Sequence, residues 1–243
     1  MPKPHNHKGA MIPPNPLQVR MNEIFEQTTR SALKELSGAP WVLLFNGDAI
    51  EGHHHHNSSE IISPNPNVHT AIAIDLLRPL ADAAKKSGGD VIMIKGTPCH
   101  VGEFESQIGE ALGAIPNEAT GEFAFDELRV VINGIMCDFK HHMPVTSRAH
   151  LEASAMGIVM ANQTTNDARD GKRIARFMGR AHRHVGGIFS TWLQTFMVTP
   201  SYQAKTPHGF KVVPESGQNF GCGTALAKER GQMFDVKLHM ESL

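Results

Sequence analysis

The chain has 243 residues, of which 40% are hydrophobic and 19% charged, and its 23 basic and 24 acidic residues leave a net charge of -1. A chain of this length buries roughly 70–75% of its unfolded surface without needing disulfides, and its balanced charge excludes a general attraction to nucleic acid or anionic membranes. The N-terminal residues lack the apolar core of a signal peptide, and no run approaches the roughly 20 apolar residues of a membrane span. We therefore expect a globular, cytoplasmic protein without a membrane partner. Its unusual feature is 15 histidines.

The first half of the sequence alternates between helical and strand patterns. Residues 1–16 are rich in Pro, Asn and His and predict an irregular arm. Asn15 and Pro16 predict a helix N-terminus, after which apolar residues recur at helical spacing as far as Leu36. Four further elements are expected here, two buried strands at 41–45 and 91–94 and two helices at 68–86 and 103–113.

The second half is dominated by strand patterns. Asn133-Gly134 is a strong hairpin signal between apolar runs at 128–132 and 135–139. A helix is expected at 147–161, and shorter strand-like pieces follow at 188–198, 210–213 and 235–240. Because no repeat or linker divides the chain, we expect one domain over 17–243. The order of strands and helices predicts an α/β sandwich rather than a barrel.

Four of the apolar runs end in a short polar cluster. These clusters read GDAIE at 47–51, GTPCH at 96–100, KHH at 140–142 and GRAHRH at 179–184. Ligands bind outside the carboxyl ends of strands in open α/β sheets, so the clusters are expected to converge. A carboxylate with several imidazoles suits Mn, Fe, Zn or Ni. Each cluster alone is a weak signal, since an Asp often caps a turn and paired histidines are usually surface residues, but the four in this order are much more specific.

This order resembles the signature of calcineurin-like metallophosphoesterases, which reads GDxx(D/E), GNH(D/E), H and GHxH, each after a strand. The GTPxH variant at 96–100 looks like the phage and prophage branch of that family. The resemblance covers about 17–197 and implies a four-layer αββα sandwich. It also implies hydrolysis of a phosphomonoester or phosphodiester at two divalent metal ions, Mn first, with Fe, Zn or Ni as alternatives. Two such ions clamp the ester and lower the pKa of a bridging water.

The resemblance also implies roles for individual residues. Asp48 would be the bridging carboxylate, and His141, His182 and His184 would be further metal ligands. His100 would be the catalytic residue that orients the phosphate or protonates the leaving group, as a histidine of near-neutral pKa is suited to do. Four further residues are secondary or substrate-contacting candidates, namely Thr97, Glu51, His142 and His54.

The sequence departs from the family pattern in three places. Thr97 stands where the family has an asparagine ligand. Arg180-Ala181 stands before the first histidine of the last motif, where the family has glycine. The D-x-H motif of an initial strand is not found, although His5-Asn6-His7 imitates its spacing without the aspartate. We therefore expect the natural start to lie upstream of Met1, so that this chain lacks two metal ligands and its first strand and has impaired activity. Whether His5 and His7 replace the motif is left open.

Two other features bear on the function. His53–His56 predicts a native loop at the rim of the site. The basic run Lys172, Arg173, Arg176, Arg180 and Arg183 is either a solvated face or a contact surface for a polyanion, which would favour a nuclease.

Three alternatives stand beside a phosphoesterase that hydrolyses a phosphomonoester or phosphodiester. The aromatic fraction of 6% offers few platforms for stacking bases, so nucleic acid is not the favoured substrate. A silent remnant of the family that acts as a binding module is favoured by the missing first motif. A single-zinc peptidase is disfavoured because no H-E-x-x-H occurs. The oligomeric state is left open.

Overall fold

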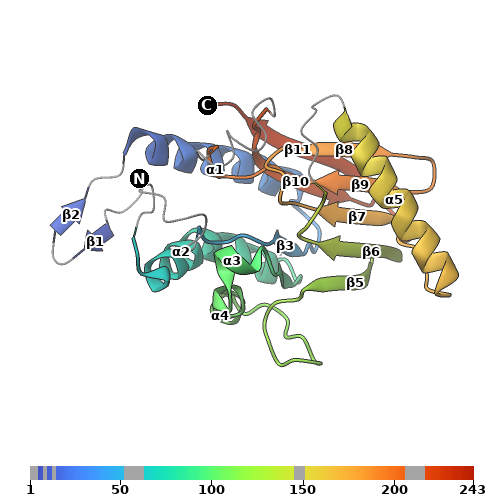
Figure 1. The fold of residues 1–243 in the computed structure, drawn as a ribbon, viewed down its shortest axis with the longest axis horizontal. Helices are drawn as coiled ribbons and strands as arrows, with labels where there is room; N and C mark the ends of the chain where they lie inside the picture. Colours follow the sequence, from blue (N-terminus) through green and yellow to red (C-terminus); the bar gives the residue numbers. More distant parts are fainter. Residues whose placement is uncertain (1–4, 8–9, 13–14, 52–62, 145–150, 206–216) are drawn as a thin grey trace.

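The computed structural model describes residues 5–7, 10–12, 15–51, 63–144, 151–205 and 217–243, which form five helices and eleven strands (Figure 1). The helices are α1 (Pro16–Glu35), α2 (Pro66–Lys86), α3 (Pro98–Val101), α4 (Phe104–Leu112) and α5 (Glu152–Arg169). The strands are β1 (His5–His7), β2 (Ala10–Ile12), β3 (Leu43–Asn46), β4 (Val91–Ile94), β5 (Glu127–Ile132), β6 (Ile135–Lys140), β7 (Phe177–Arg180), β8 (Gly187–Ser190), β9 (Thr195–Val198), β10 (Phe220–Leu226) and β11 (Asp235–Glu241).

The strands form one large sheet and three pairs. The large sheet has the order β5-β6-β7-β9-β8, in which β6, β7 and β9 run parallel and the two edge strands run antiparallel to their neighbours. β3 and β4 form a parallel pair, while β10 with β11 and β1 with β2 form antiparallel pairs. Among the described residues, β3 has a ladder only with β4, and β10 only with β11.

Both faces of β4 are buried, because successive side chains along the strand pack alternately against the helices and against the large sheet. Val91 and Met93 pack against residues of α2 and α4, whereas Ile92 and Ile94 pack against β6 and β7 of the large sheet. Residues of β10 and β11 join the same inter-sheet core. Strands buried on both faces are nearly continuous apolar runs, which is why 91–94 reads Val-Ile-Met-Ile.

The outer faces are covered by helices. Met156 and Met160 of α5 pack on Met178, Phe196 and Val198 of the large sheet. On the other side α2 and α4 cover β3 and β4, and α1 contacts β10 and β11. The layers are therefore helix, sheet, sheet and helix, which confirms the predicted αββα sandwich.

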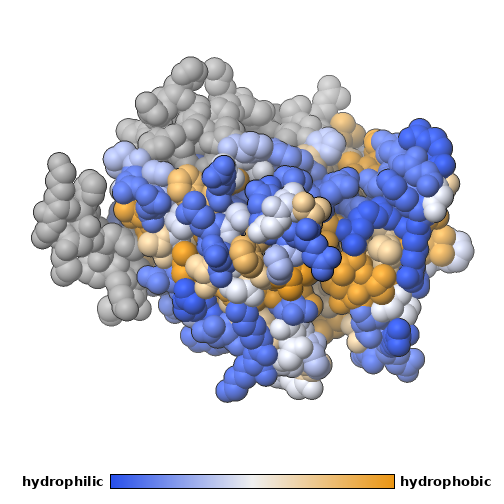
Figure 2. Space-filling model, turned by 90° about the horizontal axis from the view of Figure 1, so that it is seen from below, coloured by the Kyte–Doolittle hydropathy of each residue, from blue (hydrophilic) through white to orange (hydrophobic). Residues whose placement is uncertain are grey.

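The face of the molecule drawn in Figure 2 is mostly hydrophilic, as expected when the apolar residues lie between the layers. Smaller apolar areas lie between its hydrophilic side chains. None of the helices in the described ranges has the length and apolar character needed to cross a bilayer.

Short-range signals in the sequence predicted most of these elements correctly. The side chain of Asn15 accepts the Gln18 N–H and Gln18 caps Asn15 in return, so α1 begins where the capping signal predicts. Asn133 and Gly134 have φ values of 48° and 84°, as the two central residues of a type I′ hairpin turn require. The hairpin of β5 and β6 is thereby confirmed.

Other elements differ from the sequence predictions. The expected irregular arm contains the β1–β2 hairpin, which projects to the left of the layers in Figure 1. The run at 188–198 is two strands, β8 and β9, joined by a turn. β10 was not predicted, because glycines at 221 and 223 lower its strand propensity and only pairing with β11 supplies its ladder. The predicted strand at 210–213 lies outside the described residues.

Candidate metal centre

The loops that follow β3 and β4 pack directly on each other. Asp48 follows β3 with a left-handed backbone, at φ 56°. Its Oδ1 accepts the Thr97 N–H at 2.6 Å, and the Thr97 hydroxyl donates to Oδ2 at 3.3 Å. A Cβ on Gly96 would overlap the backbone nitrogen and Oδ1 of Asp48. The absence of a side chain at 96 therefore lets the two loops meet at the carboxyl ends of adjacent parallel strands.

His141, at the end of β6, is buried and has a defined orientation. Its Nδ1 lies 2.6 Å from the carbonyl oxygen of Asn46, and because a carbonyl only accepts, Nδ1 carries the proton. Nε2 lies 2.9 Å from Asp48 Oδ2 and 3.2 Å from His182 Nδ1. Because a carboxylate only accepts, Nε2 donates to Asp48 when the ring is protonated on both nitrogens, and in the neutral ring it has a lone pair that a metal ion can take. Metal-binding histidines are usually held in this way, with the second nitrogen donating to a carbonyl or carboxylate.

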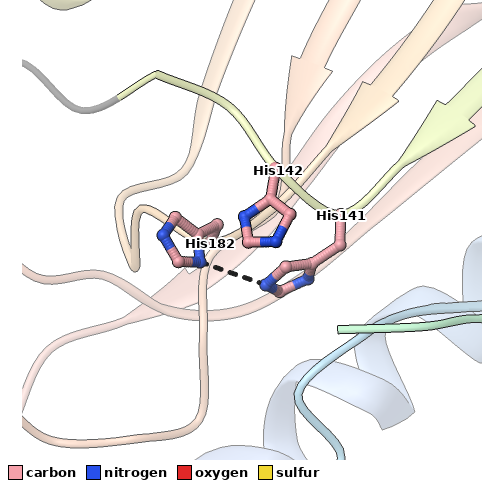
Figure 3. Close-up of side chains that lie close together, drawn as sticks. All are labelled: His141, His142 and His182. Carbon is pink, nitrogen blue, oxygen red and sulfur yellow. Dashed lines mark hydrogen bonds between the residues drawn. The ribbon is translucent and has the colours of Figure 1, made fainter. Parts of the chain in front are cut away.

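His182 follows β7 and completes the group. Figure 3 shows its ring facing those of His141 and His142, with a hydrogen bond to His141. One ligand nitrogen from each of these three histidines lies within 4.8 Å of the other two. The Thr97 hydroxyl is 3.3 Å from His182 Nδ1. Asp48, Thr97, His141, His142 and His182 are therefore brought together from the ends of four strands.

Two residues of this cluster, and His184 next to it in the chain, have an unusual backbone conformation. Asp48, His182 and His184 have φ values of 56°, 72° and 56°, and only one other described non-glycine residue, Asn133, has a positive φ. Such conformations cost about 1–3 kcal/mol each and concentrate at functional sites. Asp and His adopt this region more readily than most residues, so the strain supports a functional role for Asp48 and His182 together with their place in the cluster.

The other predicted site residues are placed as follows. His184 lies two residues after His182 and is half-buried, but it is not one of the three clustered histidines. Glu51 accepts a hydrogen bond from the side chain of Gln203. His100 belongs to α3, but its side chain is outside the described part of the structure, as is the whole of His54 with the loop His53–His56.

Two buried polar residues near these loops were missed by the sequence analysis. Asn46 is buried, with 7% of its surface exposed, and yet neither polar atom of its side-chain amide has a hydrogen-bond partner in the described structure. The carboxylate of Glu105 is fully buried and accepts backbone N–H groups from both loops. Each had a sequence signal, because each interrupts an apolar pattern. Asn46 stands at the end of a buried strand, and Glu105 shares a helix face with Ile108 and Leu112.

Burial and the neighbouring charges set the protonation of the cluster. Burial lowers the pKa of His141, but the hydrogen bond and charge of Asp48 outweigh it and raise the pKa overall. Burial, together with the charges of His141 and His142, lowers the pKa of His182 to about 4. His182 is therefore a neutral imidazole at physiological pH, the form that binds metal ions.

These shifts predict a specific titration of the metal-free chain. His182 is expected to stay neutral until the pH falls to about 4, whereas His141 takes up its proton above the ordinary pKa of 6.5. Since unfolded His182 binds a proton before folded His182 does, its contribution to stability is full above pH 6.5 and is lost between 6.5 and about 4. NMR titration of the imidazole signals checks this, and a His182 midpoint near 6.5 contradicts it.

The donor set fits a divalent ion. One carboxylate and two or three imidazoles are ligands that Mn, Fe, Zn and Ni accept. Ligand atoms that share an ion at about 2.1 Å lie about 3 Å apart, and the separations of His141 Nε2 from Asp48 Oδ2 and His182 Nδ1 are 2.9 and 3.2 Å. Asp48 Oδ2 and His182 Nδ1 are farther apart, at 4.0 Å. The residue types and the two shorter separations therefore fit a divalent ion.

The basic run at 172–183 is largely used inside the fold. Arg173 donates to the carbonyl of Gly134, and Arg176 donates to the carbonyl of Gly231. Arg180 is 2% exposed and forms an ion pair with buried Asp138. Arg180 is thus withdrawn from the surface, whereas Arg173 stays exposed and Arg176 half-buried in spite of these contacts.

Comparisons with known proteins give structural neighbours only at a low level of similarity. No protein-family model and no curated protein matches the sequence. Wild-type Vps29 of Entamoeba histolytica, complexed with Zn²⁺, is 13% identical over 82% of this chain and 98% of its own, with a TM-score of 0.40. Vps29 of Cryptosporidium parvum is 13% identical over 83% and 97%, with a TM-score of 0.36. The fold class accordingly rests on the layers of this chain itself.

Proposed function

We propose that this chain is a metal-dependent phosphoesterase that hydrolyses a phosphomonoester or phosphodiester. The observation that carries the proposal is that His141 Nε2 lies within hydrogen-bond distance of both Asp48 and His182, each of the three residues coming from the carboxyl end of a different strand. Their order along the chain matches the calcineurin-like motifs, and the GTPxH segment supports the phage and prophage branch. The proposed cofactor is a pair of divalent ions, with Mn first.

The residues of the cluster have distinct tasks in this proposal. Asp48 and His182 hold metal ions together with His141, whose ring is oriented by the Asn46 carbonyl. The Thr97 N–H holds Asp48 Oδ1, which leaves the other carboxylate oxygen toward the histidines. Divalent ions bound here supply Lewis-acid stabilisation of the phosphate and activate water.

Other residues complete the proposal from the motif order alone. His184 is the further metal ligand, and His100 orients the phosphate or protonates the leaving group. Glu51, His142 and His54 are candidates for contact with the substrate. The initial D-x-H motif is not part of this sequence, so we propose that one of the two metal positions is weak and that the activity of this chain is reduced.

The test measures binding and hydrolysis together. The wild-type chain is dialysed against Mn²⁺ and its metal content is measured, and hydrolysis of 4-nitrophenyl phosphate and bis(4-nitrophenyl) phosphate is then followed with and without a chelator. We expect Mn²⁺-dependent hydrolysis that is lost in His182→Ala. His239→Gln is the control, because buried His239 contacts Glu35 and Ser31 rather than the metal centre.

Two results contradict the proposal. Hydrolysis that survives both metal removal and His182→Ala would show that the cluster is not the active site. Bound Mn²⁺ without hydrolysis of either ester, by contrast, would favour the silent binding module over an enzyme.

A further inference from the structure

Glu105 is a carboxylate in an environment that normally excludes one. It lies on the buried face of α4 with Ile108 and Leu112, and its side chain is fully buried. None of the ion pairs among the described residues involves it. A buried carboxylate without a cation is unfavourable unless other groups stabilise it, so its place on this face requires an explanation.

The partners of Glu105 are backbone amides of the two loops that form the metal centre. Oε1 accepts the N–H of Ala49 at 2.9 Å, and Oε2 accepts the N–H of Gly96 at 2.5 Å. Ala49 follows Asp48, and Gly96 precedes Thr97. One carboxylate therefore ties the loop after β3 to the loop after β4.

The two hydrogen bonds of Glu105 are next to the hydrogen bond from the Thr97 N–H that orients the Asp48 carboxylate. The N–H groups of Gly96 and Thr97 are consecutive, and they donate to Glu105 and to Asp48 respectively. The Ala49 amide is fixed immediately after Asp48, whose backbone is held in the left-handed region. A shift of either loop would therefore move the Asp48 carboxylate relative to His141 and His182.

We propose that Glu105 is a positioning residue, which fixes the loop of Asp48 against the loop of Thr97 and thereby sets the metal affinity of the centre. The inference rests on the proposed function, because it concerns the same site. Burial raises the pKa of Glu105 to about 7 in spite of its two amide hydrogen bonds, which shows how poorly the charge is otherwise accommodated. An apolar residue would suit the buried face of α4 better, but it could not accept these N–H groups.

The variant Glu105→Gln separates this role from simple packing. The amide has nearly the same shape, but its nitrogen cannot accept, so one of the two loop N–H groups loses its partner. Glu110→Gln is the matched control, since Glu110 is an exposed glutamate on the same helix. Changes to groups that hold metal ligands in place typically weaken binding 10- to 100-fold, and we expect Mn²⁺ affinity to fall by about this factor in Glu105→Gln alone.

A second readout does not depend on metal. In the metal-free chain, the amide proton of Thr97, which donates to Asp48, is expected to shift by NMR in Glu105→Gln and to stay unchanged in Glu110→Gln. Hydrolysis by Glu105→Gln should return at high Mn²⁺ concentration, which a loss of folded protein would not allow. If the wild-type chain binds no Mn²⁺, the proposed function fails, whereas the Thr97 signal still decides the role of Glu105.

The inference is overturned by an unchanged Thr97 signal, or by unchanged Mn²⁺ affinity in a wild-type chain that binds the ion. If Glu105→Gln does not fold, hydrogen exchange in the metal-free wild type takes its place. The amides of Ala49 and Gly96 should then exchange as slowly as amides of the β3–β4 ladder. Exchange as fast as in exposed loops would likewise overturn the inference.

Discussion

Asp48→Asn is expected to weaken Mn²⁺ binding at least about 100-fold, because losing a direct ligand costs more than the 10- to 100-fold found for groups behind the ligands. The substitution keeps the shape of the side chain, and its amide oxygen can still accept the Thr97 N–H, so the fold should survive. What it removes is the negative charge next to His141 and His182. Hydrolysis of phosphate esters should fall by at least the same factor, as measured by titration with Mn²⁺ and by initial rates.

The charge of Asp48 also predicts a change that is visible without metal. Asp48 raises the pKa of His141 through a hydrogen bond and its charge, so Asp48→Asn should lower the pKa of that imidazole. Asp82→Asn on the exposed face of α2 is the control for loss of one acidic charge. Wild-type Mn²⁺ affinity in Asp48→Asn would mean that the three histidines hold the ion by themselves.

Gly96→Ala is expected to damage the site through the backbone. The added Cβ would overlap the nitrogen and Oδ1 of Asp48, and one of these is a backbone atom that cannot rotate away. Overpacking of this kind typically costs 1–3 kcal/mol, so we expect the free energy of unfolding to fall by about that much. Mn²⁺ affinity should fall about 10- to 100-fold as well, because the Asp48 carboxylate must move.

The matched control is Gly217→Ala. No atom of the described residues lies within 4 Å of a Cβ at this position, and its φ is not in the left-handed region. Denaturant unfolding and Mn²⁺ titration of both variants check the prediction. Equal effects in the two variants would show that the close approach of the loops is not required.

The two variants probe different properties of one site. Asp48→Asn changes charge with little change of shape, whereas Gly96→Ala changes the distance between two loops and keeps the chemical identity of every ligand. Loss of metal in both would show that the centre depends on the ligand and on its support. Loss in Asp48→Asn alone would show that the loops adapt to an added methyl group.

Patterns that are local in the chain were enough for much of the fold. Capping by Asn15 and the Asn133-Gly134 turn depend on neighbouring residues only, so both could be read from the sequence. The apolar run at 91–94 could be assigned to a buried strand for the same reason. The β1–β2 hairpin and β10 could not be predicted, because a three-residue strand is too short for alternation and a glycine-containing strand depends on its partner.

Within the site, the sequence determined which residue types end the strands, and its motif order was sufficient to select Asp48, Thr97, His141, His142 and His182. It could not show that Glu105 and the carbonyl of Asn46 hold these residues in place, since those contacts join segments far apart in the chain. It also left the basic run open, whereas the structure places Arg173, Arg176 and Arg180 in internal contacts. Only the tertiary structure decided these points, because a buried charge or amide acquires its role from groups that lie far from it in the chain and next to it in the fold.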